Sequence, residues 1–327
     1  MPEIGDRRRL STPEIGVQTQ NVIDDKDPAE GFELLKRAGF DCCDFSLNGY
    51  LKNTSLYRQK VNAFFDQPEQ ELERFFRPHK EAAEAAGIRI HQMHMPYPNY
   101  VPGAGSELND YLKDVVAGKS MKICAFLGCR YLVVHGFKLA YYLGSEEAEW
   151  EKTRGFIEYL APMAKELGIT ICLENLYANI GKHIVEGPCC DAGKAAARID
   201  AVNEKYGADV LGFCFDTGHA NLAGIDFEEF IVTLGDRIKV LHIHDNDGVG
   251  DLHQIPFTFT KSRENKTSTD WTGFLNGLRR IQFEKVLSFE TAPALTTFPD
   301  AMKEEVLRFI AEIGRYFAES VAEEGSV

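Results

Sequence analysis

The chain has 327 residues, of which 44% are hydrophobic and 26% are charged, a balance typical of water-soluble globular proteins. Its net charge of −14 argues against a protein whose main partner is nucleic acid, because phosphate contacts need a basic surface. No apolar run is long enough to cross a bilayer, so we expect no membrane partner.

The N-terminal segment favours a cytoplasmic location, and the cysteines are interpreted with that location in mind. The arginine cluster at residues 7–9 is not followed by the apolar segment that a signal peptide needs. Eight cysteines are present, and no two of them have the CxxC spacing. We therefore expect most of them to be small core residues of a cytoplasmic protein.

Eight short runs rich in Val, Ile, Phe or Cys predict β-strands. In chain order these runs cover residues 14–20, 40–47, 88–95, 131–137, 170–176, 211–218, 240–245 and 285–291.

Five helices are predicted between and after these strands. Three of them, at 28–39, 69–87 and 150–168, end in glycine, which is a helix stop signal. The other two cover 270–283, with Asp270 as the capping residue, and 300–321.

Repeated alternation of strands and helices predicts an α/β fold with a parallel sheet. Eight strands without a Gly-, Ser- or Pro-rich linker favour one domain over 1–327, a (β/α)8 TIM barrel. The barrel itself is expected over about 14–316, with short extensions at both ends. The longest irregular segments, 48–66 and 254–269, follow strand ends, where such a barrel keeps its active-site loops.

The last four strands end in a common pattern. Residues two apart in a strand face the same side, so each strand aims a small or polar residue and then an ionisable residue at one face. The pairs are Cys172 and Glu174, Cys214 and Asp216, His242 and His244, and Ser288 and Glu290.

The upper members of these pairs predict a metal site. Glu174, Asp216, His244 and Glu290 would meet at the mouth of the barrel, where three carboxylates repel one another unless a cation lies among them. Carboxylate and imidazole ligands suit Mn²⁺, Mg²⁺, Co²⁺ or Zn²⁺. Each residue alone would be explained as well by a solvated loop position.

Further candidates surround this site. They are His94, His135, His219, Asp251 and His253. Taken alone, His135 in "VVHG" is as typical of a hydrogen-bonded core residue as of a ligand or catalyst. His79 and His183 have no partners in sequence, and we expect both at the surface.

Four segments, "ICLEN", "CFDTGHANLAG", "LHIHDNDGVGDLHQIP" and "LSFET", carry a resemblance to the xylose isomerase-like barrel superfamily. That superfamily includes sugar epimerases, inositol-pathway enzymes and endonuclease IV. The resemblance implies that Glu174, Asp216, His244 and Glu290 bind the metal. In the ketose 3-epimerase branch it further implies that the two glutamates exchange protons with the substrate carbon, one on each face. It also implies that His219 contacts sugar oxygens.

Two positions depart from the ketose epimerase pattern. Ile180 stands six residues after the first ligand, where those enzymes carry a glutamate. Gly250 stands six residues after the ligand histidine, where they carry an arginine.

The resemblance leaves three kinds of enzyme open. The leading expectation is a divalent-metal-dependent sugar isomerase or epimerase with Glu174, Glu290 and His135 as catalytic residues. It would bind one ion, Mn²⁺ before Mg²⁺, Co²⁺ or Zn²⁺, and a small sugar held by His94, His219, Asp251 and His253.

The second possibility is a metal-dependent lyase that cleaves oxidised glycosides, including C-glycosides, with a small partner subunit and with His135 as an extra base. The third is an endonuclease IV-like enzyme with three zinc ions, for which nine groups of suitable type exist. They are His94, His135, Glu174, Asp216, His219, His244, Asp251, His253 and Glu290. A homo-oligomer and a non-catalytic binding protein also stay open.

Overall fold

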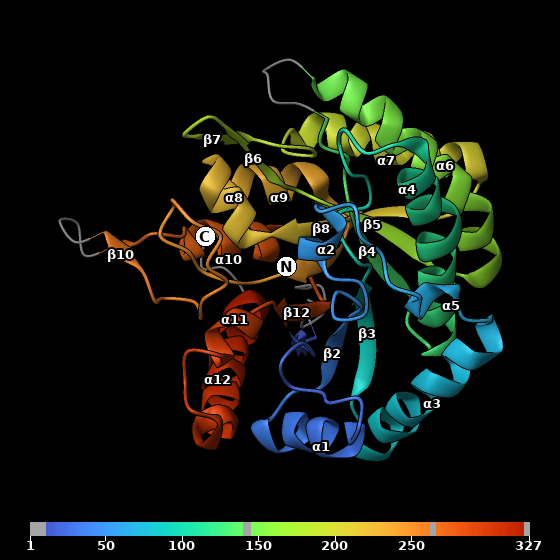
Figure 1. Ribbon diagram of the computed structural model, residues 1–327. Helices are drawn as coiled ribbons and strands as arrows, with labels where there is room; N and C mark the ends of the chain where they lie inside the picture. The colour runs from blue at the N-terminus through green and yellow to red at the C-terminus, as the bar shows by residue number, and fades with distance from the viewer. Residues whose placement is uncertain (1–10, 140–144, 262–265, 324–327) are drawn as a thin grey trace, which may run out of the picture.

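Eight parallel strands form the barrel that the sequence predicts (Figure 1). The computed structural model describes residues 11–139, 145–261 and 266–323, so the N-terminal arginine cluster lies outside the described residues. The barrel strands are β1 (Glu14–Gln18), β2 (Cys42–Ser46), β3 (Arg89–His94), β4 (Tyr131–His135), β5 (Thr170–Glu174), β8 (Leu211–Asp216), β9 (Ile238–His242) and β12 (Val286–Phe289).

The sheet closes on itself between β9 and β12. The strand order is β12-β1-β2-β3-β4-β5-β8-β9, and just beyond β9 the Ile243 amide donates to the Ser288 carbonyl over 2.8 Å. The Glu290 amide in turn donates to the Ile243 carbonyl over 3.0 Å. These bonds join the two ends of the sheet, which confirms the predicted TIM barrel.

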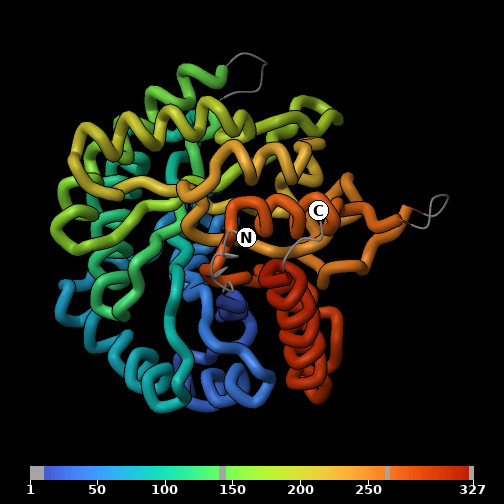
Figure 2. Tube along the Cα trace, turned by 180° about the vertical axis from the view of Figure 1, so that it is seen from behind, coloured from blue at the N-terminus to red at the C-terminus, as the bar shows by residue number. Residues whose placement is uncertain are grey.

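The barrel is surrounded by helices, which Figure 2 shows from behind. The longer helices are α1 (Pro28–Ala38), α3 (Glu69–Ala86), α5 (Gly118–Phe126), α6 (Glu146–Leu167), α7 (Ala192–Tyr206), α9 (Phe227–Leu234), α10 (Trp271–Arg280) and α12 (Lys303–Ala322). The shorter ones include α2 (Asn53–Leu56), α4 (Ser106–Tyr111), α8 (Thr217–Ala223) and α11 (Ala292–Leu295). Among the described residues, no helix combines the length and the apolar character needed to cross a membrane.

The helix ends follow the predicted signals. Gly39, Gly87 and Gly168 end α1, α3 and α6 in the left-handed conformation, and Asp270 accepts a hydrogen bond from the Gly273 amide at the start of α10. The prediction missed α5, α7 and α9 among the longer helices, and all four of the shorter ones, α2, α4, α8 and α11. The buried face of α7 consists of only three residues, so its apolar period is weak in the sequence.

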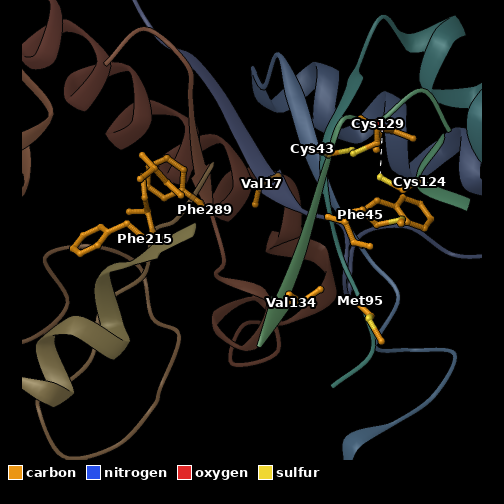
Figure 3. Packing of buried hydrophobic residues seen from close by; sticks show 14 of the residues in the cluster. Val17, Cys43, Phe45, Met95, Cys124, Cys129, Val134, Phe215 and Phe289 are labelled. Atoms are coloured by element: carbon orange, nitrogen blue, oxygen red, sulfur yellow. Dashed lines mark hydrogen bonds between the residues drawn. The ribbon is translucent and has the colours of Figure 1, made fainter. Parts of the chain in front are cut away.

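The hydrophobic core fills the space between the strands and the helices. Phe45, Phe215 and Phe289 point outward from their strands and are among the buried side chains in Figure 3. Phe215 packs on Phe274 of α10 and Phe289 on Phe317 of α12, with ring centroids 6.2 and 6.3 Å apart. Inside the barrel a small apolar layer consists of Val133, Cys172, Cys214 and Val240.

The cysteines behave as predicted. None of the eight forms a disulfide, and all except Cys189 are buried. His183 is exposed as expected, but the surface prediction for His79 is wrong. The His79 ring is 1% exposed under aromatic side chains, and its Nε2 lies 3.0 Å from Oδ1 of Asp25.

A pair of charged residues ties the last helix to the barrel. The two terminal guanidinium nitrogens of Arg315 on α12 donate to Asp41, over 2.7 and 2.9 Å, and the Ile15 amide donates to the same carboxylate. Burial raises the pKa of Asp41, but Arg315 and the Ile15 amide outweigh it and hold that pKa below the ordinary value.

We expect Asp41→Asn to lower the free energy of unfolding by about 1–2 kcal/mol at pH 7. Because the folded-state pKa of Asp41 is depressed, this stabilisation is complete above the unfolded-state pKa of about 4. It disappears as the pH falls through the folded-state pKa. Denaturant titrations of both proteins at pH 7 and pH 3 measure the difference, with exposed Glu33→Gln as control. A difference that is the same at both pH values would contradict this interpretation.

Candidate functional site

Four acidic or histidine side chains from four strands converge at the carboxyl end of the barrel. Glu174 ends β5, Asp216 ends β8, His242 ends β9, and Glu290 directly follows β12. All four are at most 8% exposed, and one ligand atom from each lies within 4.8 Å of the others. The structure therefore brings together three of the four predicted metal-binding residues, and His242 lies beside them.

The level of His242 follows from the pairing of β8 with β9. The register shifts between Phe213 and Cys214, and His242 then pairs with Asp216. Its Nδ1 lies 3.0 Å from Oε1 of Glu174 and 3.3 Å from Oε2 of Glu290. Burial opposes a charged ring, but the surrounding acidic groups raise the pKa of His242 well above its ordinary value.

His244, the predicted ligand, lies one step further along the chain. Its Nε2 is 3.0 Å from Oδ2 of Asp216, and its ring stacks on His253 with centroids 3.9 Å apart. His244, His253 and Glu290 form a second group whose ligand atoms lie within 4.8 Å of one another. The Nδ1 atom of His244 is buried and has no hydrogen-bond partner among the described residues. Both His242 and His244 are thus placed to offer a nitrogen ligand.

Three polar residues that the sequence reasoning missed lie beneath the site. Asp44 on β2 is fully buried, and its Oδ2 lies 3.0 Å from Nε2 of His242. Gln92 on β3 donates to the same oxygen over 3.2 Å, and Gln18 on β1 donates to Oε1 of Glu290 over 2.5 Å. The sequence did contain a signal for these residues, namely an inward-facing polar residue within a mostly apolar strand. Asp44 in "CCDFS" is an example.

His94 and His135 form one wall of the site. Nε2 of His135 lies 2.9 Å from Oε2 of Glu174, and Nε2 of His94 lies 3.1 Å from the same nitrogen of His135. Burial lowers the pKa of His135 to about 4, although Glu174 acts in the opposite direction. His135 is therefore neutral at pH 7 and can accept a proton. The pKa of Glu174 is lowered well below its ordinary value by His242 and His135, against the effect of burial.

Asp251, His253 and His219 form the opposite wall. Asp251 lies 3.4 Å from Nε2 of His219 and 3.3 Å from Nε2 of His253. Burial would lower the pKa of His253, but Glu290 and Asp251 raise it to about 9. The loop after β9 is brought back over the barrel by paired backbone bonds between Asp245 and Gln254.

These walls enclose one cleft of about 770 Å³. Seven of the predicted site residues line it, while Asp216 and His244 lie buried beneath its surface. The seven are His94, His135, Glu174, His219, Asp251, His253 and Glu290.

The residues present fit a divalent cation. Three carboxylates and a histidine nitrogen are the donor types that Mn²⁺, Mg²⁺, Co²⁺ and Zn²⁺ accept. Clustered carboxylates repel one another unless positive charge lies among them, and no group in the described part of the chain hydrogen-bonds to the buried Nδ1 of His244.

Gly218 makes room for the His244 ring. A Cβ atom at position 218 would lie 1.9 Å from Cε1 of His244, so the ring must move in any larger variant. We expect Gly218→Ala to weaken Mn²⁺ binding by about 10–100-fold in calorimetric titrations, the usual cost of disturbing the support of a ligand. Gly155→Ala on α6 is the matched control, because among the described residues no atom outside its own helix backbone and chain neighbours lies within 4 Å of the new Cβ. Equal Mn²⁺ affinities for the original protein and both variants would show that His244 is not a metal ligand.

A comparison with known families decides the classification. The family model described as xylose isomerase-like TIM barrel matches residues 32–313. The chain belongs to the xylose isomerase-like TIM-barrel family.

Curated relatives match only part of this chain. A probable endonuclease 4 from Methanoculleus marisnigri is 32% identical over 187 residues, covering 53% of this chain and 61% of the relative. The chain matches between 25% and 61% of the length of the first three curated relatives, which is less than two thirds.

Two solved structures share the fold over nearly the whole chain. D-allulose 3-epimerase from Methylomonas sp. has a TM-score of 0.64 at 16% identity, covering 94% of this chain and 98% of that one. 3-Keto-D-glucoside 4-epimerase from E. coli has a TM-score of 0.63 at 15% identity, covering 92% and 99%. At these identities the likeness concerns the fold of this xylose isomerase-like barrel.

Proposed function

We propose that the protein is a divalent-metal-dependent enzyme of the sugar isomerase and epimerase type. It would move a proton at a carbon next to a carbonyl group of a sugar or sugar derivative. The observation that carries this proposal is the pair Glu174 and Glu290, two buried carboxylates that line one cleft and lie 3.0 and 3.3 Å from the same nitrogen of His242.

Glu174, Asp216 and Glu290, with His244 or His242, would hold the cation. When bound, a divalent cation polarises a substrate carbonyl and so acidifies the neighbouring C–H bond. Mn²⁺ is our first choice, with Mg²⁺, Co²⁺ and Zn²⁺ as alternatives.

Proton transfer and substrate binding would be performed by side chains of this chain. Glu174 is ionised at neutral pH, since its pKa is lowered well below the ordinary value, and it can accept the substrate proton. Glu290 enters the same cleft from β12 and would return a proton to the carbon. His94, His219, Asp251 and His253 line the cleft around them and would bind the sugar oxygens.

Exchange of the substrate proton with solvent tests this function. The protein would be incubated with Mn²⁺ in D₂O and with a panel of ketoses and 3-keto-glucosides, and deuterium next to the carbonyl would be followed by NMR. We expect enzyme-dependent incorporation into at least one compound. Absence of incorporation across the whole panel, with metal shown to be bound, would reject the function.

A second candidate is elimination from an oxidised glycoside, which starts with the same proton removal. The neutral His135 favours it, because this ring lies 2.9 Å from Glu174 and provides a further base. Release of the free aglycone would distinguish elimination from epimerisation. The small partner subunit, the homo-oligomer and the cytoplasmic location stay predictions.

The charge of the cleft favours sugar chemistry over an endonuclease IV-like activity. Its described lining contains two lysines, Lys138 and Lys194, among seven carboxylates. A DNA-binding surface needs the opposite balance.

A further inference from the structure

The cleft is larger than the group of catalytic candidates requires. Its volume of about 770 Å³ lies in the upper part of the range of about 300–1,000 Å³ that holds drug-sized ligands. Beyond Glu174 and Glu290 the cleft continues outward along three segments. They are residues 97–102 after β3, residues 136–139 after β4, and the hairpin of β6 (Tyr177–Ile180) and β7 (His183–Glu186).

The outer part of the cleft has an aromatic and apolar wall. Tyr100, Leu176, Tyr177 and Ile180 line it, and all except Leu176 are half-buried. The Tyr100 ring is fixed by stacking on Phe137, with centroids 5.0 Å apart and planes 20° apart. Such rings bind a flat or apolar group well, because its burial removes apolar surface from water on both sides.

Lys138 provides one polar group in this wall. Its Nζ lies 5.0 Å from the centroid of the Tyr177 ring. Within the described part of the chain, Lys138 has neither an ion-pair partner nor a hydrogen-bond acceptor for this ammonium group. An ammonium group beside a cleft can therefore donate to an oxygen of a ligand.

We infer that the outer part of the cleft is an aglycone subsite, consisting of Tyr100, Lys138, Leu176, Tyr177 and Ile180. This inference rests on the proposed function. The substrate class is a keto-glycoside with an aromatic aglycone: its sugar lies at Glu174 and Glu290, its ring packs on the tyrosines, and Lys138 donates to an oxygen of the aglycone. A free monosaccharide would leave this wall in contact with water.

Two glycosides with the same reacting sugar test the subsite. They are the phenyl and the methyl β-glycosides of 3-keto-D-glucose, used with the full chain loaded with Mn²⁺. We expect the phenyl compound to bind about 10–100-fold more tightly by calorimetry, a difference of about 1.4–2.8 kcal/mol, because its ring is buried in the cleft. The ratio of kcat/KM for deuterium exchange should favour it similarly.

Variants on the hairpin locate the effect. Ile180→Glu places a carboxylate in the apolar wall and should bring the phenyl-to-methyl ratio near one; Tyr177→Ala should lower it as well. His183→Glu is the matched control, because it adds the same carboxylate to an exposed position on the same hairpin that does not line the cleft. The control should keep the ratio of the original protein.

The outcomes separate the subsite from the reaction. Equal binding of both glycosides by the original protein, or a ratio that Ile180→Glu and Tyr177→Ala leave unchanged, would overturn the subsite. Preferred binding of the phenyl compound without any deuterium exchange would support the subsite and reject the proposed reaction.

Discussion

Glu290→Gln should lower kcat/KM for deuterium exchange by about 10²–10⁴-fold, the usual contribution of a positioned acid or base. The amide is close in size to the carboxylate and can still accept a hydrogen bond from Gln18, which donates over 2.5 Å to Oε1 in the original protein. It can neither deliver a proton to the substrate carbon nor remove one in the reverse direction. The loss should therefore persist at Mn²⁺ concentrations that saturate the variant, which calorimetry would establish beforehand.

Glu186→Gln is the matched control for this experiment. Glu186 lines the same cleft on the hairpin, is exposed, and lies outside the group around Glu174. Its variant should keep exchange activity within a few-fold. If Glu290→Gln with saturating Mn²⁺ keeps more than a tenth of the exchange rate, Glu290 is not a catalytic residue.

Removal of the metal should destabilise the folded protein. Glu174, Asp216 and Glu290 are at most 8% exposed, and one carboxylate oxygen from each lies within 4.8 Å of the others. Without a metal, only the His242 ring within this group can offset the repulsion between the three negative charges. A cation that binds only the folded state adds about 2.7 kcal/mol of stability at a free concentration 100 times its Kd. For a chain of 327 residues, whose unfolding entropy is about 2.1 cal/mol/K per residue, that corresponds to a rise in Tm of roughly 4 °C.

Thermal unfolding of chelator-treated protein, with and without added Mn²⁺, measures this stabilisation. Asp216→Asn should reduce the shift, because it removes one of the three carboxylates. An unchanged Tm at every Mn²⁺ concentration up to the millimolar range would show that the carboxylate cluster is stable without a cation.

The sequence predicted the strands and the residues at their ends, because both depend on local patterns. Inward residues alternate with outward ones, so Cys172 with Glu174 and Cys214 with Asp216 could be placed on the barrel interior before the structure was known. The pairing register between neighbouring strands could not be predicted in this way. It depends on the register shift at Cys214 on β8, which pairs His242 with Asp216 and which no local pattern predicts.

Partners that are distant in sequence were also beyond prediction. Asp44 and His242 are 198 residues apart, and only the closed barrel brings them within 3.0 Å. His79 was expected at the surface because its partner, Asp25, lies 54 residues away on the other side of β2 in the sequence. A buried histidine cannot be recognised before its hydrogen-bond partner is known.

Metal stoichiometry tests the central claim most directly. Elemental analysis of protein purified without chelator should find about one divalent cation per chain, and the same analysis of Asp216→Asn should find much less. Close to three zinc ions per chain would instead favour the endonuclease IV-like reaction and call for an assay on abasic DNA. No bound metal, even after incubation with Mn²⁺, Mg²⁺, Co²⁺ and Zn²⁺ in turn, would contradict the metal centre and the function built on it.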